Sequence, residues 1–160
     1  MKSFLSRQRS VLCGNCDKEE SSVSFHGEIV FSITDDRHID VDFGSRFQPA
    51  KMVQKGDVIA LGRRAPKYRW IYKAEYGDEE QFLVRLDQIT DQLCEKRDYV
   101  NQLIESYEKV EIDIYIRSDL AQIGFSLPDG LLKRLALSGC ALNFHILSFG
   151  MAAEEETEGG

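Results

Sequence analysis

Residues 110–116, VEIDIYI, form the most regular alternation of apolar and polar side chains in the chain. Valine or isoleucine occupies every even position of this segment, whereas Glu111, Asp113 and Tyr115 occupy the odd positions. A period of two residues is typical of a β-strand with one buried face and one face in water. We therefore expect a sheet that other elements cover on one side.

Four other segments have the alternation or composition of strands. Three of them are residues 23–33, 68–74 and 141–147. The fourth, residues 123–127, is expected to pair with 110–116 across a short turn. The side chains expected to share one face of the first strand are Phe25, Gly27, Ile29, Phe31 and Ile33, and those expected to point inward from the last strand are Leu142, Phe144 and Ile146.

Residues 79–107 carry apolar side chains three and four positions apart, which is the spacing of an amphipathic helix. The charged cluster at residues 95–98 interrupts this apolar stripe, so two helices in succession are expected. A third helix is expected to begin at Pro128 and to stop at Gly139, because proline is favoured in the first turn of a helix and glycine just after the last.

Residues 34–44, TDDRHIDVDFG, allow two interpretations. Alternation of Ile39, Val41 and Phe43 favours a strand, whereas a helix could be capped by Asp35 or Asp36 and ended by Gly44. In a strand, His38, Asp40 and Asp42 would project from one face and could hold a divalent cation. The alternative is a solvated polar face without a metal.

The order of these elements mixes strands and helices without a regular βαβ pattern, which predicts an α+β fold. We expect a single domain with a mostly antiparallel sheet and helices packed on one face. Residues 1–22 are expected to form a loosely ordered N-terminal extension, residues 23–150 the domain, and residues 151–160 an acidic disordered tail. No secretory signal or apolar run of about 20 residues is visible, so a cytoplasmic protein outside the membrane is expected.

Several strings in the chain resemble one protein family. They are FQPAKMVQKGD, RWIYKAE followed by FLVRLDQITDQL, and IGFSLPDGLLKRLALSGCALNFHIL. Their order over about Val23 to Leu147 resembles the bacterial family known as domain of unknown function 4279. The resemblance implies a compact α+β domain of cytoplasmic bacterial proteins and favours a short helix around Ile39 to Phe43. Some members of the family look like immunity proteins of bacterial toxin systems, and the family offers no catalytic residues to carry over.

The charge of the chain is unevenly distributed. The net charge is −7, but residues 51–73 contain seven basic residues and one acid, so this segment carries +6 and the rest of the chain −13. An acidic chain disfavours nucleic acid as the main partner. Cations interleaved with aromatic rings are typical of interfaces, so an acidic protein partner is expected here. The candidate partner-binding residues are Arg63, Arg64, Lys67, Tyr68 and Arg69. The alternative is an ordinary charged loop next to a buried Trp70.

The CGNC sequence places Cys13 and Cys16 at the spacing of half a zinc site. His26, His38 or a second subunit could supply the missing ligands, and the alternatives are a redox pair or two ordinary thiols. The sequence requires no metal, and no cofactor is expected.

No catalytic motif is present in the sequence: GxSxG, HExxH and a glycine-rich phosphate loop are all missing, and the three histidines lie far apart. We therefore expect a protein-binding domain rather than an enzyme, for example an immunity-type inhibitor of a bacterial toxin. Two alternatives remain open. One is a small enzyme or ligand-binding domain with a pocket between the sheet and the helices, and the other is a zinc-binding accessory protein.

Overall fold

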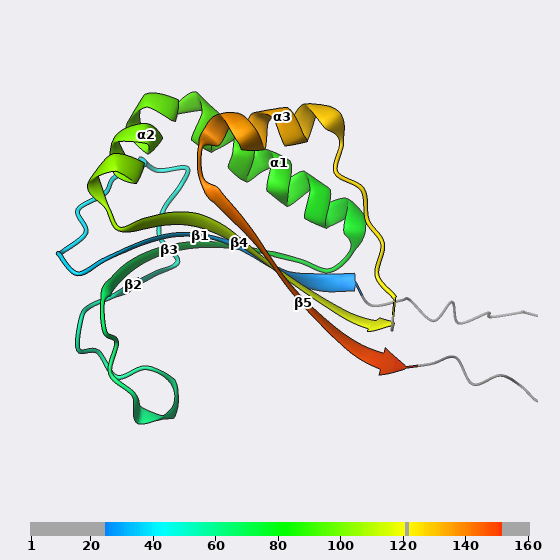
Figure 1. Cartoon of the computed structure of the whole chain (residues 1–160), viewed down its shortest axis with the longest axis horizontal. Helices are drawn as coiled ribbons and strands as arrows, with labels where there is room; N and C mark the ends of the chain where they lie inside the picture. The colour runs from blue at the N-terminus through cyan, green and yellow to red at the C-terminus, as the bar shows by residue number, and fades with distance from the viewer. Residues whose placement is uncertain (1–24, 121, 152–160) are drawn as a thin grey trace, which may run out of the picture.

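A computed structural model describes residues 25–120 and 122–151, which form five strands and three α-helices (Figure 1). In chain order the elements are β1 Phe25–Asp35, β2 Lys51–Val53, a 3₁₀ turn Ala60–Gly62, β3 Tyr68–Tyr76, α1 Glu79–Glu95, α2 Arg97–Ser106, β4 Lys109–Leu120, α3 Asp129–Ser138 and β5 Ala141–Met151. The strand order is β2-β3-β1-β4-β5, with three antiparallel pairs and one parallel pair, β4 with β5. The helices lie on one face of the sheet, which confirms the predicted α+β class.

The predicted extension, residues 1–22, lies outside the described residues, as do Cys13 and Cys16. The same holds for the predicted acidic tail, except that Met151 is the last residue of β5.

The core fills the space between the sheet and the helices. Strand register aligns Phe31 with Tyr72 of β3 and Ile112 of β4. Two residues earlier on the same face, it aligns Ile29 with Ala74 and Ile114. The helices contribute the buried side chains Phe82, Leu86, Ile89, Leu93, Val100, Leu103, Leu131 and Leu135. The space between the sheet and the helices is therefore the packed core that the alternating strands and amphipathic helices predict.

The predicted ends of the helices agree with the structure. The carboxylate of Asp78 accepts a hydrogen bond from the Gln81 backbone N–H at 2.7 Å, which caps the start of α1. The helical stretch breaks at Lys96, between α1 and α2. Gly139 has a φ of 71° at the end of α3, a left-handed conformation that glycine adopts without steric cost.

The predicted hairpin between 110–116 and 123–127 is wrong. Residues 122–128 form no strand, and the neighbour of β4 on that side is β5. A parallel pair needs a crossover connection, which α3 and the preceding loop provide. The Phe125 ring instead contacts Phe25 and Phe82 at centroid distances of 6.2 and 5.6 Å. The alternation in residues 123–127 therefore reflects the burial of side chains and does not indicate pairing with another strand.

Residues 36–43 are neither helix nor strand, so the short helix that the resemblance implies is also wrong. Ile39 and Phe43 are buried in the core, as both interpretations required. The backbone between them bonds to side chains, because the hydroxyls of Tyr107 and Tyr99 accept from the N–H groups of Asp40 and Asp42 at 3.3 and 3.2 Å. Side-chain partners thus replace the regular backbone hydrogen bonds of a helix or a sheet.

The inward orientation predicted for β5 holds only in part. Leu142 is half-buried, but Phe144 and Ile146 are exposed although they project from the helix-covered face of the sheet. Because β5 is an edge strand, its second half extends beyond the cover of the helices (Figure 1).

Candidate functional site

The second face of the sheet is not covered by any described helix (Figure 1). We call it the open face and define it by the side chains that alternate with the core residues. They are Glu28, Val30, Ser32 and Thr34 of β1, Arg69, Ile71, Lys73 and Glu75 of β3, Lys109, Glu111, Asp113 and Tyr115 of β4, and Asn143 and His145 of β5. Most of these side chains are polar, so this face can form directional contacts with a partner.

A shallow depression of about 620 Å³ lies on the open face, and we call it the sheet hollow. Arg69 of β3 and Lys109 of β4 line one part of the hollow. Asp113, Tyr115 and His145 line another. The sheet hollow therefore combines cations, carboxylates and hydrogen-bonding groups from both antiparallel and parallel strand pairs.

Asp113 organises the part of the sheet hollow that lies over β4 and β5. This carboxylate is 6% exposed and accepts hydrogen bonds from Asn143 Nδ2 and His145 Nε2, both at 3.1 Å. Asn143 Nδ2 also donates to Glu111 Oε2 at 3.2 Å. A buried carboxylate that accepts several hydrogen bonds holds its donors in fixed positions. The positions of Asn143 and His145 are therefore set before any partner binds.

Tyr115 extends this cluster. Its ring stacks on the imidazole of His145, with centroids 4.5 Å apart and planes 13° apart. Burial raises the pKa of Tyr115, and the nearby Asp113 carboxylate raises it further, while Arg69 acts in the opposite direction. The phenol consequently stays protonated at neutral pH and can donate a hydrogen bond into the hollow.

Ser32 lies at the centre of the open face and is fully buried, between Ile71 of β3 and Glu111 of β4. Its hydroxyl forms no hydrogen bond with any of the described residues. A buried hydroxyl without a partner costs about 1–3 kcal/mol. The sheet thus retains an unsatisfied polar group at the position opposite Glu111.

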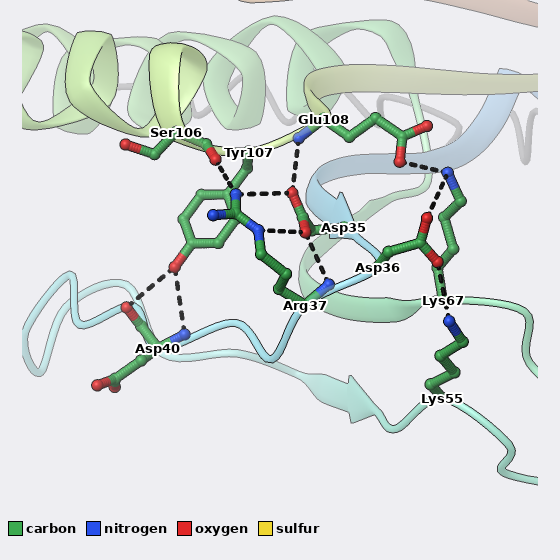
Figure 2. A network of polar contacts seen from close by, with 9 residues as sticks. All are labelled: Asp35, Asp36, Arg37, Asp40, Lys55, Lys67, Ser106, Tyr107 and Glu108. Carbon is green, nitrogen blue, oxygen red and sulfur yellow. Dashed lines mark hydrogen bonds and ion pairs between the residues drawn. The ribbon is translucent and has the colours of Figure 1, made fainter.

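A polar network borders the sheet hollow where β1 ends (Figure 2). Asp35 accepts hydrogen bonds from the backbone N–H and Nε of Arg37 at 2.7 and 3.0 Å, and from the Glu108 N–H at 3.0 Å. Arg37 Nη2 also donates to the carbonyl oxygen of Ser106. This network joins the irregular segment after β1 to the turn that precedes β4.

Lys67 connects this network to the hollow. Its ammonium group pairs with Glu108 and lies 3.8 Å from Asp36 Oδ2, and Lys55 pairs with the other oxygen of Asp36 at 3.0 Å (Figure 2). The hydrogen bond to Glu108 raises the pKa of Lys67. The Lys67 charge is therefore engaged within the protein and helps to fix the rim of the hollow.

Asp35 should make folding stability depend on pH. Hydrogen bonds from the side chain and the N–H of Arg37 hold the pKa of Asp35 well below its usual range. As the pH falls, the unfolded chain takes up this proton near pH 4, before the folded protein does. The stabilisation is full above that pH and is lost progressively below it. Thermal unfolding should therefore show that Asp35→Asn lowers the melting temperature by roughly 5 °C or more at pH 7, by somewhat less at pH 3 and by clearly less at pH 2.

The matched control for this prediction is Asp129→Asn, because Asp129 is exposed and pairs with Lys133 one turn along α3. This variant should differ little from the wild type at any of these pH values. A melting-temperature gap between Asp35→Asn and the wild type that stays constant from pH 7 down to pH 2 would contradict the prediction.

The structure places the five predicted partner-binding residues in three different surroundings. Arg63 and Arg64 are exposed in the loop between β2 and β3, where Arg64 Nη1 donates to the Gly56 carbonyl oxygen at 2.9 Å. Lys67 forms the rim of the sheet hollow, and Arg69 lines it. Tyr68 packs on the helix side of the sheet instead, and its ring contacts His38 at 5.6 Å between centroids. Of this set, only Lys67 and Arg69 border the hollow.

The metal hypotheses find no support in the part of the chain that the structure describes. Residues 25–120 and 122–151 contain no group of three or more His, Cys, Asp and Glu side chains that could hold a metal ion. His38, Asp40 and Asp42, the candidate cluster for an extended strand, lie in irregular backbone. Cys13 and Cys16 lie outside the described residues.

The cluster of Asp113, Asn143 and His145 is not evident from the sequence. The alternation places each of the three on the polar face of a strand, but nothing in the sequence indicates that the two strands are neighbours. The parallel register places Asp113 beside Asn143 and Tyr115 beside His145. The available signal was that both strands carry polar side chains two positions apart on their water-facing side.

None of the helices in the described residues has the length and apolar character needed to cross a membrane. Comparison with curated proteins and with solved structures gave no match. The family model described as "Domain of unknown function (DUF4279)" matches residues 29–149. This match covers most of the chain and includes all five strands and three helices at least in part. The chain therefore belongs to the DUF4279 family.

Proposed function

We propose that this chain is a bacterial, cytoplasmic protein-binding domain that recognises an acidic segment of a partner protein through the sheet hollow, as an immunity-type inhibitor of a toxin would. The observation that carries the proposal is a pair of cations without counterions. Arg69 and Lys109 flank Thr34 in one row across β3, β1 and β4, and the side chain of neither forms a hydrogen bond or ion pair with a described residue. An incoming carboxylate between them could pair with both.

The other charges of this region support the same assignment. Lys67 is paired with Glu108, and Lys73 is paired with Glu28 and Glu75, so these two lysines are neutralised within the protein. Residues 78–106, which include α1 and α2, contain eight acidic and three basic residues. Electrostatic repulsion by this helical layer would turn an acidic partner toward the open face, and such steering speeds association.

Charge reversal on the open face should test this proposal. The partner to be used is the product of the gene directly upstream of the gene for this chain, and binding is measured by calorimetry at two salt concentrations. We expect the wild-type chain to bind, and Arg69→Glu and Lys109→Glu each to weaken binding at least about tenfold because they place a carboxylate opposite the partner's acids. Higher salt should reduce these differences.

Two further variants locate the site. Arg97→Glu changes an exposed cation of α2 on the helical side and should leave the affinity unchanged within about twofold. Arg63→Glu tests the loop that the sequence pattern indicated, and it should also have little effect if the sheet hollow is the site. Absence of binding by the wild type would contradict the protein-binding role, and an effect of Arg63→Glu equal to that of Arg69→Glu would contradict the hollow as its location.

A second candidate function is a small-ligand site or a catalytic site in the same hollow. The observation that favours it is the imidazole of His145, which Asp113 holds through Nε2 while Nδ1 has no partner among the described residues. A carboxylate that orients a histidine in this way is typical of proton-transfer sites. The space between the sheet and the helices, where such a pocket was expected, is filled by core side chains.

A further inference from the structure

Among the residues that the structure describes, none pairs with the outer edge of the last strand, β5. Its eleven residues, ALNFHILSFGM, include no charged residue and no proline. Exposed strand edges offer free backbone N–H and C=O groups, and proteins usually block them with lysine, proline or a short strand. β5 has none of these three, and its pairing with β4 is irregular only after Ser148, where Gly150 has a φ of 66°.

Apolar side chains accompany this free edge on both faces of the sheet. Phe144 and Ile146 project from the face that carries the helices, and they are 39% and 54% exposed. Leu147 and Phe149 alternate with them and are 51% and 58% exposed. Exposed apolar residues gathered along an unpaired edge mark an interaction surface.

We propose that β5 pairs with β5 of a second copy of this chain, in antiparallel orientation about a two-fold axis, and thereby forms a continuous ten-stranded sheet. A second copy fits because a strand without charges meets no like-charge repulsion when it pairs with itself. Eleven residues span about 36 Å, and the edge is about 20 Å thick where the helices back the sheet and about 10 Å thick beyond them. The edge thus presents roughly 550 Å² per copy, so a dimer buries about 1,100 Å² in total, just above the roughly 1,000 Å² that a specific interface needs.

The exposed apolar side chains of β5 define the register, because Gly150 has a φ of 66° and the pairing with β4 shifts after Ser148, so the strand is not regular to its end. With the axis at Ile146, residues 143–149 pair, and Ile146 lies opposite Ile146 of the other copy. The paired residues on the open face are then His145 with Leu147 and Asn143 with Phe149. Because the axis is perpendicular to the sheet, both sheet hollows lie on the same face of the dimer and next to the interface. This inference does not depend on the proposed partner.

The self-opposed position of Ile146 permits a direct test by sedimentation equilibrium. The wild type is expected to be a dimer at micromolar concentration. Ile146→Lys and Ile146→Glu should each raise the dimer dissociation constant roughly 100-fold, because two apolar side chains are lost and like charges are placed opposite each other. An equimolar mixture of the two variants should restore the dimer, because lysine then lies opposite glutamate.

The matched control is Leu61→Lys. Leu61 is 95% exposed and belongs to the loop between β2 and β3, at the other end of the sheet, so its substitution should leave the dimer intact. A monomeric wild type, or an Ile146→Lys variant that still dimerises like the wild type, would overturn the proposal. Failure of the mixture to restore the dimer would also overturn it, since both variants change an exposed residue and circular dichroism can verify that each is folded.

Discussion

Replacing Gly27 with alanine is expected to destabilise the protein by about 4 kcal/mol or more, the largest effect of any single methyl group added to the sheet. A Cβ at this position would lie 1.8 Å from the carbonyl oxygen of Tyr115 and 2.7 Å from the hydroxyl of Tyr76. The obstacle is backbone, which cannot rotate away as a side chain can. The two central strands, β1 and β4, would have to separate at this point.

The Tyr76 hydroxyl makes this clash more severe. It donates a hydrogen bond of 2.7 Å to the same Tyr115 carbonyl oxygen, and it is buried. An alanine at position 27 therefore displaces a satisfied buried hydroxyl as well as a strand. Because Tyr115 lines the sheet hollow, the variant should also disturb the candidate site.

Urea unfolding measures this effect. Gly124→Ala is the matched control, because a Cβ at Gly124 would have no atom within 4 Å, and its stability should remain within about 0.5 kcal/mol of the wild type. The total stability of a domain this size is about 5–15 kcal/mol, so the Gly27→Ala chain should lose most of its soluble yield as well. A Gly27→Ala protein with nearly wild-type stability would contradict the register that aligns Gly27 with Ile116.

Replacing Phe31 with alanine should cost about 3–5 kcal/mol of unfolding free energy. Phe31 is fully buried in β1, and its ring contacts Phe43, Phe47 and Trp70 at centroid distances of 5.6 to 6.0 Å. The cavity left by its removal cannot collapse easily, because Trp70 is itself held on the neighbouring strand. The substitution therefore removes both buried apolar area and the platform on which Phe43 and Phe47 rest.

This second prediction can be followed with an intrinsic probe, since Trp70 is the single tryptophan of the chain. Its fluorescence should be shifted to the red in Phe31→Ala even before unfolding, because water gains access to the indole. Val58→Ala, at an exposed position between β2 and β3, is the control and should change neither the fluorescence nor the stability. An unchanged emission maximum together with a loss below about 1 kcal/mol would show that the ring cluster is less tightly packed than these contacts indicate.

The irregular segment after β1 shows where local patterns stop being informative. Ile39 and Phe43 could be recognised as core residues in either interpretation, because both a strand and a helix would bury them. The actual path depends on the hydroxyl groups of Tyr99 and Tyr107 and on the Glu108 N–H that binds Asp35, and these partners lie 57 to 73 residues away along the chain. No periodicity within the segment carries that information.

In the candidate site, too, local sequence patterns indicate some residues, whereas the tertiary structure decides which of them lie together. Arg69 was identified from the sequence, because a cluster of cations and aromatic rings is visible locally. The separation of Arg63 and Arg64 from Arg69 could not be anticipated, since it follows from the path of the loop between β2 and β3, in which Val58 and Arg64 pair as an isolated bridge. The grouping of Asp113, Asn143 and His145 depends on which strand lies beside β4, and that choice is made by the crossover through α3.

The sequence by itself determined which residues alternate, which form amphipathic helices and where helices end, as at Lys96 and Gly139. These features depend on neighbours within a few positions along the chain, and their physical causes are local: the pleat of a strand, the pitch of a helix and the conformational freedom of glycine. Only the tertiary structure decided that β4 pairs in parallel with β5, that residues 122–128 pack without forming a strand and that one face of the sheet remains open. Apolar alternation records that a side chain is buried, but it does not specify the strand or ring against which that side chain packs.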